Sequence, residues 1–530
     1  MKRAFFAGLF MLLYVAHSQT LPLQIQESKV YKMTTPRVQN DFILPDGKGG
    51  FVTISTKRSG FLANPLVFES YVTYYDNNME QVFKKTFKLN KGSVKGSIKA
   101  AFLVHDTLNM INLETNYRKK YISFKRIVLD AKTGEAREKE FLKIDRIYPK
   151  NEVNLYVNLN SLYYEKLKYY SDVNFFNPKI FVKFSDNQQY FAIIYRGFET
   201  TKTIYQVNVF DKTFNKVYTG TLFNNSLPEL FYINDLVVDD KTGDVYVAGK
   251  LLKQNPMKVK HYLNADNLKH FILYKVSKSG VKSFSIKPEK VVEQLYLIKS
   301  KELVIYGFYR NRIIDVNDID GIYRMNMDVS SFIKRSEMYD NFSKKLVSTD
   351  YKKSRKRSKN HKMIVRKSYL LSDGSLLINS EDFYIPSMVK KKEREAQLRE
   401  VVADIFSIKV SREGKVIWSN GIYKEQFVKP RLALHSFFST LHKGYNYLLF
   451  TDTRMQKSGK KDPFYLSGKD LQNLYGAKIS PHGELKKGLV KENKRSKFRF
   501  MPIEGTMISE DEAIIPAKDH QFIKFYKIKF

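Results

Sequence analysis

Cysteine is absent from all 530 residues of the sequence, and tryptophan occurs only once, as Trp418. Without cysteine the chain can form no disulfide bond, no thiolate metal site and no thiol nucleophile. A lipoprotein signal peptide is excluded too, because it needs a cysteine to carry the lipid. A chain of this length must therefore be held together by a large apolar core.

Long apolar runs are also scarce, apart from one at the amino terminus. Lys2 and Arg3 precede a nearly unbroken apolar segment, Ala4 to Ala16, and Ser18 follows. This pattern is typical of a secretory signal peptide, which we place at residues 1–18. The segment is shorter than the about 20 residues that a membrane-spanning helix needs. The sequence predicts an exported protein of the periplasm of a Gram-negative bacterium, with attachment to the outer membrane or cell surface as the alternative, and no transmembrane segment in the mature chain.

Acidic residues are few beside the basic ones. The sequence has 54 aspartates and glutamates against 91 lysines and arginines, a formal net charge of +37. Such an excess attracts anionic partners, among them acidic proteins, lipopolysaccharide and anionic glycans. Nucleic acid is anionic as well, but export separates the protein from it, so we predict no nucleic-acid partner. Lysine also keeps proteins soluble, so the charge alone does not identify a partner.

The segment Ile233–Leu252, INDLVVDDKTGDVYVAGKLL, shows the pattern that fills the chain. Two apolar stretches, at 236–238 and 245–247, flank a polar turn at 239–244. Apolar strands around a turn rich in Asp and Gly predict a β-hairpin. The same shape recurs eight times with different residues. The eight turns are centred near Asp46, Asp106, Asn187, Thr242, Ser300, Asp373, Lys443 and Glu510.

A second hairpin follows each of the first seven, so that each repeat supplies four strands, the content of one propeller blade. After the eighth first hairpin only Gln521–Phe530 remains, whereas Ser28–Val38 is a spare strand near the mature amino terminus. We therefore predict an all-β protein, a single β-propeller over residues 19–530 with eight four-stranded blades. The last blade is closed by Ser28–Val38 pairing with Gln521–Phe530, which removes two exposed sheet edges. Seven blades are the alternative, because the gap between the second and third turns is long.

A transmembrane β-barrel is the rival all-β interpretation. The alternating aromatic residues that end at Phe530 resemble the last strand of an outer-membrane barrel. Such a barrel needs strands of about ten residues with an uncharged face toward the lipid. The strands expected here are mostly shorter, and in Val82–Leu89 lysines occupy both faces. These features favour the propeller.

Three predicted insertions interrupt the repeats, at residues 158–178, 342–362 and 387–406. The first is rich in tyrosine and phenylalanine. In the third, Ser387 suits a helix N-cap, and Leu398, Val401 and Val402 lie at helical spacing, which predicts a short inserted helix near 387–402. Function in rigid ring folds commonly resides on such loops, so the insertions are candidates for partner contacts.

Two dense basic runs occur, one at Tyr351–Lys362 inside the second insertion and one at Lys491–Phe500. A solvated loop is one interpretation of such a run. The other is a contact surface for an acidic protein or another anion. The candidate partner- or anion-binding residues are Lys352, Lys353, Arg355, Lys356, Arg357, Lys359, Lys494, Arg495, Lys497 and Arg499.

Signatures of catalysis and of metal binding are missing from the sequence. It has no HExxH zinc motif, no GxSxG nucleophile elbow and no P-loop. His435 and His442 fall within one predicted hairpin, where structural roles are more common than catalytic ones. Asp315–Gly321 carries several oxygen ligands but departs from the calcium-loop spacing, so we interpret it as a polar loop. We predict no catalytic residue, no metal ligand and no cofactor, and interpret the protein as non-enzymatic.

The repeat at residues 235–249 resembles that of secreted bacterial β-propellers, through an Asp at 239, Gly-Asp at 243–244, an apolar triplet at 245–247 and a Gly at 249. The resemblance implies the fold and no activity. In size, export and lack of a lipid anchor the protein is also similar to soluble periplasmic subunits of outer-membrane translocons, including the plug-type subunit of the type 9 secretion channel. That similarity implies a scaffold that docks onto an envelope or outer-membrane protein complex. The alternative is a glycan-binding or carbohydrate-active propeller.

Overall fold

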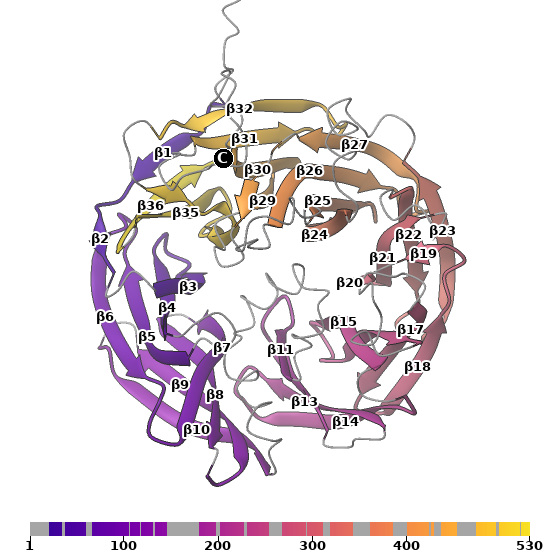
Figure 1. Ribbon diagram of the computed structural model, residues 1–530, viewed down its shortest axis with the longest axis horizontal. Helices are drawn as coiled ribbons and strands as arrows, with labels where there is room; N and C mark the ends of the chain where they lie inside the picture. Colours follow the sequence, from indigo (N-terminus) through magenta and orange to yellow (C-terminus); the bar gives the residue numbers. More distant parts are fainter. Residues whose placement is uncertain are drawn as a thin grey trace, which may run out of the picture.

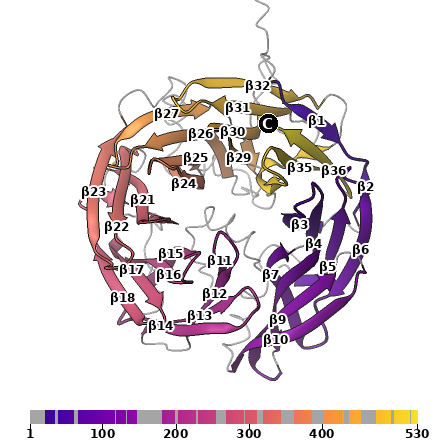
Figure 2. The same ribbon diagram turned by 180° about the vertical axis from the view of Figure 1, so that it is seen from behind.

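The described residues form eight antiparallel sheets set side by side in a closed ring around a central axis (Figures 1 and 2). This computed structural model is an eight-bladed β-propeller, in which the first strand of each blade lies nearest the axis and the last at the circumference. The predicted fold class is thereby confirmed. The structure describes residues 21–33, 38–59, 66–104, 106–116, 118–130, 133–145, 180–197, 202–226, 230–253, 268–292, 294–310, 319–342, 361–384, 400–422, 424, 426–428, 436–452, 473–493, 498–519 and 521–530.

Blades 1 to 4 each consist of four strands in chain order from the axis outward. Blade 1 contains β3 (Val38–Pro45), β4 (Phe51–Ser59), β5 (Leu66–Tyr75) and β6 (Gln81–Lys88). Blade 2 contains β7 (Val94–Val104), β8 (Thr107–Asn116), β9 (Tyr121–Asp130) and β10 (Ala136–Asp145). Blade 3 contains β11 (Ile180–Phe184), β12 (Tyr190–Arg196), β13 (Thr203–Asp211) and β14 (Lys216–Asn224). Blade 4 contains β15 (Phe231–Val238), β16 (Val245–Leu252), β17 (Leu268–Ser277) and β18 (Gly280–Ile286).

Blades 5, 6 and 8 add short extra strands to the same plan, whereas blade 7 has four strands. Blade 5 contains β19 (Val291–Val292), β20 (Tyr296–Lys299), β21 (Leu303–Arg310), β22 (Gly321–Met327) and β23 (Lys334–Asn341). Blade 6 contains β24 (His361–Leu370), β25 (Leu376–Tyr384), β26 (Glu400–Val410), β27 (Val416–Ile422) and β28 (Gln426–Val428). Blade 7 contains β29 (Phe437–His442), β30 (Tyr445–Asp452), β31 (Asn473–Ile479) and β32 (Leu485–Lys491). Blade 8 contains β33 (Arg499–Phe500), β34 (Thr506–Met507), β35 (Glu512–Asp519), β36 (Phe522–Lys529), β1 (Gln24–Glu27) and β2 (Tyr31–Lys32).

Blade 8 is completed by the two ends of the chain, as predicted, but with different strand bounds. β1 and β2 pair with β36, and between them Ser28 N donates to Phe525 O at 2.9 Å. The closing segment begins at Gln24 and ends by Met33, whose N–H bonds Gln521 O at 2.6 Å. The predicted range Ser28–Val38 started too late, because β36 needs partners along its whole length. It also ended too late, because Val38 opens blade 1.

The helix predicted near 387–402 is wrong at its carboxyl end. Residues 387–399 lie outside the described residues, but Glu400–Val410 is strand β26. Val401 and Val402 pair with Tyr384 and Phe383 of β25. The spacing of Val401 and Val402 from Leu398 suits one face of a helix, but β-branched residues also favour strands, and this pair belongs to a β-ladder. No α-helix occurs among the described residues; the single helical turn there is the 3-10 helix η7 (Pro502–Glu504).

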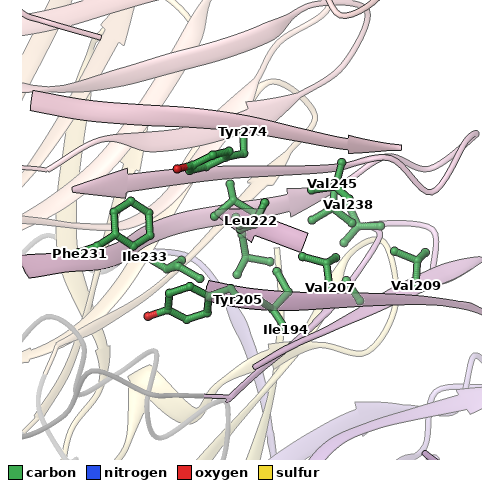
Figure 3. Close-up of a cluster of buried hydrophobic side chains, with 14 of the residues drawn as sticks. Ile194, Tyr205, Val207, Val209, Leu222, Phe231, Ile233, Val238, Val245 and Tyr274 are labelled. Atoms are coloured by element: carbon green, nitrogen blue, oxygen red, sulfur yellow. The ribbon is translucent and has the colours of Figure 1, made fainter. Parts of the chain in front are cut away.

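The core lies between neighbouring blades, where the faces of two sheets pack. Figure 3 shows one such cluster, in which side chains of blade 3 meet those of blade 4. Val207 from β13 and Val245 from β16 are both fully buried. Burial of each such side chain contributes about 1.5 to 3 kcal/mol. Because similar clusters join further blades around the ring, the absence of disulfides is compensated by apolar packing.

No helix among the described residues combines the length and the apolar character that crossing a bilayer requires.

Candidate docking surface

The two rims of the ring differ in how they connect the strands. Because the strands of each blade alternate in direction, the turns between strands 1 and 2 and between strands 3 and 4 lie on one rim. We call this the turn rim. The links between strands 2 and 3, and from each blade to the next, lie on the opposite rim, which we call the connection rim. The two rims therefore carry different parts of the sequence.

The turn rim is built from short turns that side-chain oxygens hold in place. Asp46 Oδ1 accepts the backbone N–H groups of Lys48 and Gly50 at 2.7 and 2.9 Å. Asp76, Asp211 and Asp328 hold the turns that follow them in the same way. Acids stand in these turns for this backbone reason. The eight turns predicted from the sequence all lie on this rim.

Each blade is also joined to the next by a side chain that reaches a turn carbonyl across the junction. Eight such contacts complete the circle. They are Lys85 to Gly134 O, Arg126 to Thr213 O, Tyr218 to Gly243 O, Lys275 to Val329 O, Arg324 to Ser411 O, Trp418 to Pro481 O, His442 to Glu510 O and Lys527 to Asn77 O. Part of the lysine and arginine excess thus serves the ring itself.

A carboxylate on the turn rim also joins neighbouring blades. Burial alone would raise the pKa of Asp239, but a hydrogen bond from Lys299 of the next blade and the amides of Thr242 and Lys241 lower it to about 2. The Lys299 Nζ lies 2.7 Å from the Asp239 carboxylate. Ionised Asp239 therefore binds both its own turn and blade 5. This ion pair of the turn rim therefore joins blade 4 to blade 5.

The connection rim is where the chain leaves the described strands at every predicted insertion. Insertion 158–178 falls between β10 and β11. Insertion 342–362 follows β23 and includes the first two residues of β24, and insertion 387–406 follows β25 and includes residues 400–406 of β26. The second basic run, at residues 491–500, falls between β32 and β33. The strand ends that flank all three insertions and both basic runs therefore lie on the same rim.

Most predicted binding residues cannot be placed more closely. Nine of them lie outside the described residues: Lys352, Lys353, Arg355, Lys356, Arg357, Lys359, Lys494, Arg495 and Lys497. Arg499 is described, as the first residue of β33, where it is half-buried and opposite Lys518 in the ladder. Arg499 is therefore built into blade 8, at the end of its basic run.

A buried charge cluster that the sequence analysis missed lies between blades 6 and 7. Glu381 of β25 is fully buried and contacts Arg366 of β24. The Nζ of Lys424, which follows β27 and is also fully buried, lies 3.2 Å from the Glu381 carboxylate. Ser436, directly before β29, donates its hydroxyl to Glu381 at 2.8 Å. Arg366 and Glu381 lie within β24 and β25, whereas Lys424 and Ser436 lie on the chain that links β27 to β29 on the connection rim.

The cluster fixes the chain where it passes from blade 6 to blade 7. Burial alone would raise the pKa of Glu381, but Arg366 and Lys424 outweigh it and hold this pKa below the ordinary value. The Lys424 backbone N–H also bonds Asp404 Oδ1 at 3.0 Å. A carboxylate kept ionised by two cations is a weak proton acceptor. The cluster therefore suits a rigid support for the connection rim better than acid–base catalysis.

A hollow of about 270 Å³ opens on the axial side of the ring where β7 and β11 diverge. Three phenylalanines dominate its wall, and Lys183 and Asp186 are its only ionisable residues. The lining residues are Phe42, Ala100, Ala101, Phe102, Val182, Lys183, Phe184, Ser185, Asp186 and Gln188. A single lysine and a single aspartate supply neither a carboxylate pair nor a metal-ligand set. We therefore assign no chemistry to the hollow.

Histidines and acids do not gather into a metal site within the described ranges. Of the two histidines singled out in the sequence, His435 lies outside these ranges, and His442 Nδ1 is 3.1 Å from Glu510 O of blade 8. Asp320, near the end of the calcium-like segment, donates its backbone N–H to Tyr309 O at 2.9 Å. The other acids of that segment, Asp315 and Asp318, are outside the described residues.

Aromatic side chains on the ring are largely covered by the protein's own cations. Lys290 Nζ lies 4.3 Å from the ring centre of Tyr309 and 5.4 Å from that of Tyr339. Lys478 covers Tyr445 at 4.1 Å. Such contacts are worth about 0.5 to 1 kcal/mol at exposed sites.

Comparison with known proteins supplies no family. No family model matches the sequence, and no curated relative matches it. Among solved structures, the propeller domain of the trilobed protease from Pyrococcus furiosus is 10% identical, with 82% of this chain and 93% of that chain covered and a TM-score of 0.34. The propeller domain of Nup133 from Vanderwaltozyma polyspora is 9% identical, with 83% of this chain and 98% of that chain covered and a TM-score of 0.37. An apocarotenoid oxygenase variant from Synechocystis is 8% identical, with 96% of this chain and 94% of that chain covered and a TM-score of 0.34. At these values the propeller assignment rests on the strand pairing described above.

Proposed function

We propose that this protein is a non-enzymatic scaffold that docks, through its connection rim, onto an acidic surface of an envelope or outer-membrane protein complex. An accessory or plug subunit of a secretion translocon is the kind of role that we infer. The proposal includes export to the periplasm through the signal peptide at residues 1–18. The ten basic residues named from the sequence are the proposed contacts.

One observation supports this proposal above the others. The insertions and both basic runs leave the ring from a single rim, whereas the opposite rim uses its charges to join its own blades. A rigid ring that presents variable segments on one side is the arrangement by which scaffolds position binding loops. Cationic segments on that side favour an acidic partner and speed its association.

The test is a pull-down from detergent-solubilised envelopes with the full-length protein as bait. We expect a stoichiometric envelope protein with the wild type. We expect its recovery to fall at least tenfold when Lys352, Lys353, Arg355, Lys356 and Arg357 are all changed to Gln. The matched control changes five exposed lysines of the turn rim and outer strands to Gln and should retain the partner. These control lysines are Lys212, Lys216, Lys282, Lys443 and Lys486.

Two results would contradict the proposal. Equal loss in the two fivefold variants would show that only the net charge matters. Recovery of the protein alone, with retention on an anionic polysaccharide column, would favour the glycan-binding alternative instead.

A further inference from the structure

The outermost strand of every blade is a sheet edge, and one of these edges differs from the rest. Outer strands in natural proteins are protected against unwanted pairing by charged side chains, above all lysine. Each outer strand here contains at least one ionisable residue except the two outer strands of blade 6, β27, whose sequence is VIWSNGI, and the three-residue β28, whose sequence is QFV. The protected edges carry, for example, Glu27 on β1, Lys84 on β6, Glu138 on β10, Lys216 on β14, Lys282 on β18, Arg335 on β23 and Lys486 on β32.

β27 is held firmly on its inner side. It pairs with β26 from Val416 to Ile422, and it is the last strand of the order β24-β25-β26-β27. Trp418 donates its indole N–H to Pro481 O at 3.0 Å, and Asn420 bonds Gly483 O at 2.8 Å. Both contacts attach one face of the strand to a turn of blade 7. The strand is thus fixed in an extended conformation before any partner arrives.

The other face of β27 carries Ile417, Ser419 and Gly421, of which Ile417 and Gly421 are exposed. Ile417 is 53% exposed, among the most exposed large apolar side chains of the described residues. Met338 of the neighbouring blade is 37% exposed and packs beside Gly414, just before β27. Asp340 of that blade accepts the Val416 N–H at 2.6 Å and so aligns the start of the strand. Within the described part of the chain, no strand pairs with the outer edge of β27.

We propose that β27 is a strand-addition site for an extended segment of another protein, with uncharged β-branched residues at its centre and an acidic residue at the end beside Lys415. Backbone hydrogen bonds supply affinity in this mode, and alternate side chains supply specificity. Lys415 is exposed and directly precedes the strand. A second copy of the chain is disfavoured, because each copy carries a formal charge of +37. This site is separate from the connection rim and goes beyond the proposed function.

The only tryptophan of the chain, Trp418, lies on β27 and reports binding there directly. The probe is a tryptophan-free peptide of alternating threonine and valine with two aspartates at each end. We expect the intrinsic fluorescence of the full-length protein to change saturably on titration with this peptide. Ile417→Lys places a protecting cation on the edge and should weaken binding at least tenfold, whereas Val281→Lys on β18 should leave it unchanged.

A second probe keeps the test independent of protein folding. The same peptide with alternate backbone amides methylated loses the donors of one edge, so one of the two methylated forms should fail to bind wild-type protein. Equal binding by both forms, or equal binding to Ile417→Lys and wild type, would overturn strand addition at β27, as would the absence of any saturable signal. Concentration-dependent dimers that Ile417→Lys abolishes, measured by sedimentation, would overturn the choice of partner. The connection-rim variant with Lys352, Lys353, Arg355, Lys356 and Arg357 changed to Gln should bind the peptide normally, which separates this inference from the proposed function.

Discussion

The turn rim and the connection rim are opposite ends of the same strands, yet they use polar residues differently. On the turn rim, Asp239 binds both its own turn and Lys299 of the next blade. On the connection rim, the described polar anchor is Glu381, which is sealed between two blades. On the turn rim, therefore, the Asp239 carboxylate holds a turn and joins two blades, whereas the Glu381 carboxylate is fully buried.

This contrast explains how a very basic protein can form a stable ring. Neighbouring blades would repel one another if their lysines faced each other without partners. Instead, Lys275, Arg324 and Lys527 point their charges at turn carbonyls of the next blade, where hydrogen bonds to charged groups contribute about 1.5 to 3 kcal/mol each. The basic runs that leave the connection rim remain for an external partner under our proposal.

Removal of the closing strand should have the largest effect, because both rims depend on the closed ring. Deletion of residues 21–33 leaves the outer edge of β36 unpaired and exposes Phe525, which is fully buried. We expect loss of the cooperative urea transition. A deletion that stops at residue 20 is the control and should unfold like the mature protein. A variant without residues 21–33 that melts normally would show that the seam does not hold the ring.

The next largest effect is expected at the connection-rim anchor. Lys424→Ala leaves the carboxylate of Glu381 buried with one cation fewer, and loss of one partner from a buried pair costs about 3 to 5 kcal/mol. The free energy of unfolding from urea titration measures this. Lys415→Ala, at an exposed site on the turn rim of the same blade, should change it by less than about 0.5 kcal/mol. Similar values for the two variants would mean that the cluster does not anchor the rim.

Much of the fold could be predicted from sequence, for a physical reason visible at single turns. Asp46, Asp373 and Thr242 lie in turns whose backbone N–H groups need side-chain acceptors, and this chemistry is local. The ladder from Glu400 to Val410 was missed at its start, because Val401 and Val402 suit a helix face as well as a strand. Only their pairing with β25 decides between the two.

The buried cluster and the unprotected edge could not be predicted as sites. Arg366, Glu381 and Lys424 come from three segments of blade 6 that meet only when its strands pair, and Ser436 joins them from the start of blade 7. The sequence VIWSNGI reads as an ordinary strand until its place at the circumference is known. The basic runs were visible as patterns, but their emergence from one rim depends on the strand order.

On the turn rim, Arg324 is the strongest junction. Its side chain is 2% exposed overall and donates to Ser411 O at 2.7 Å and to Gly374 O at 3.0 Å, both in blade 6. Arg324→Met keeps much of the apolar contact but leaves these carbonyls without this donor, so we expect a loss of about 2 to 3 kcal/mol. Lys486→Met on an exposed strand serves as the control. A loss under about 0.5 kcal/mol at Arg324 would show that junction hydrogen bonds add little to packing.

The smallest effect, and the one with a pH signature, is expected at Asp239. Its pKa in the folded protein, about 2, lies below the ordinary value of about 3.9 for an unfolded chain. The folded state therefore binds this proton less readily, and the ionised carboxylate stabilises the fold above about pH 4. That stabilisation is lost as the pH falls toward 2. Asp239→Asn should cost about 1 to 2 kcal/mol at pH 7, and the difference from wild type should shrink progressively below pH 4. Urea titrations at pH 7, 4 and 3 measure it. Asp186→Asn, at an exposed turn position, should show no such pH dependence. A constant difference for Asp239→Asn at all three pH values would mean that the carboxylate acts through its shape and not through its charge on the turn rim.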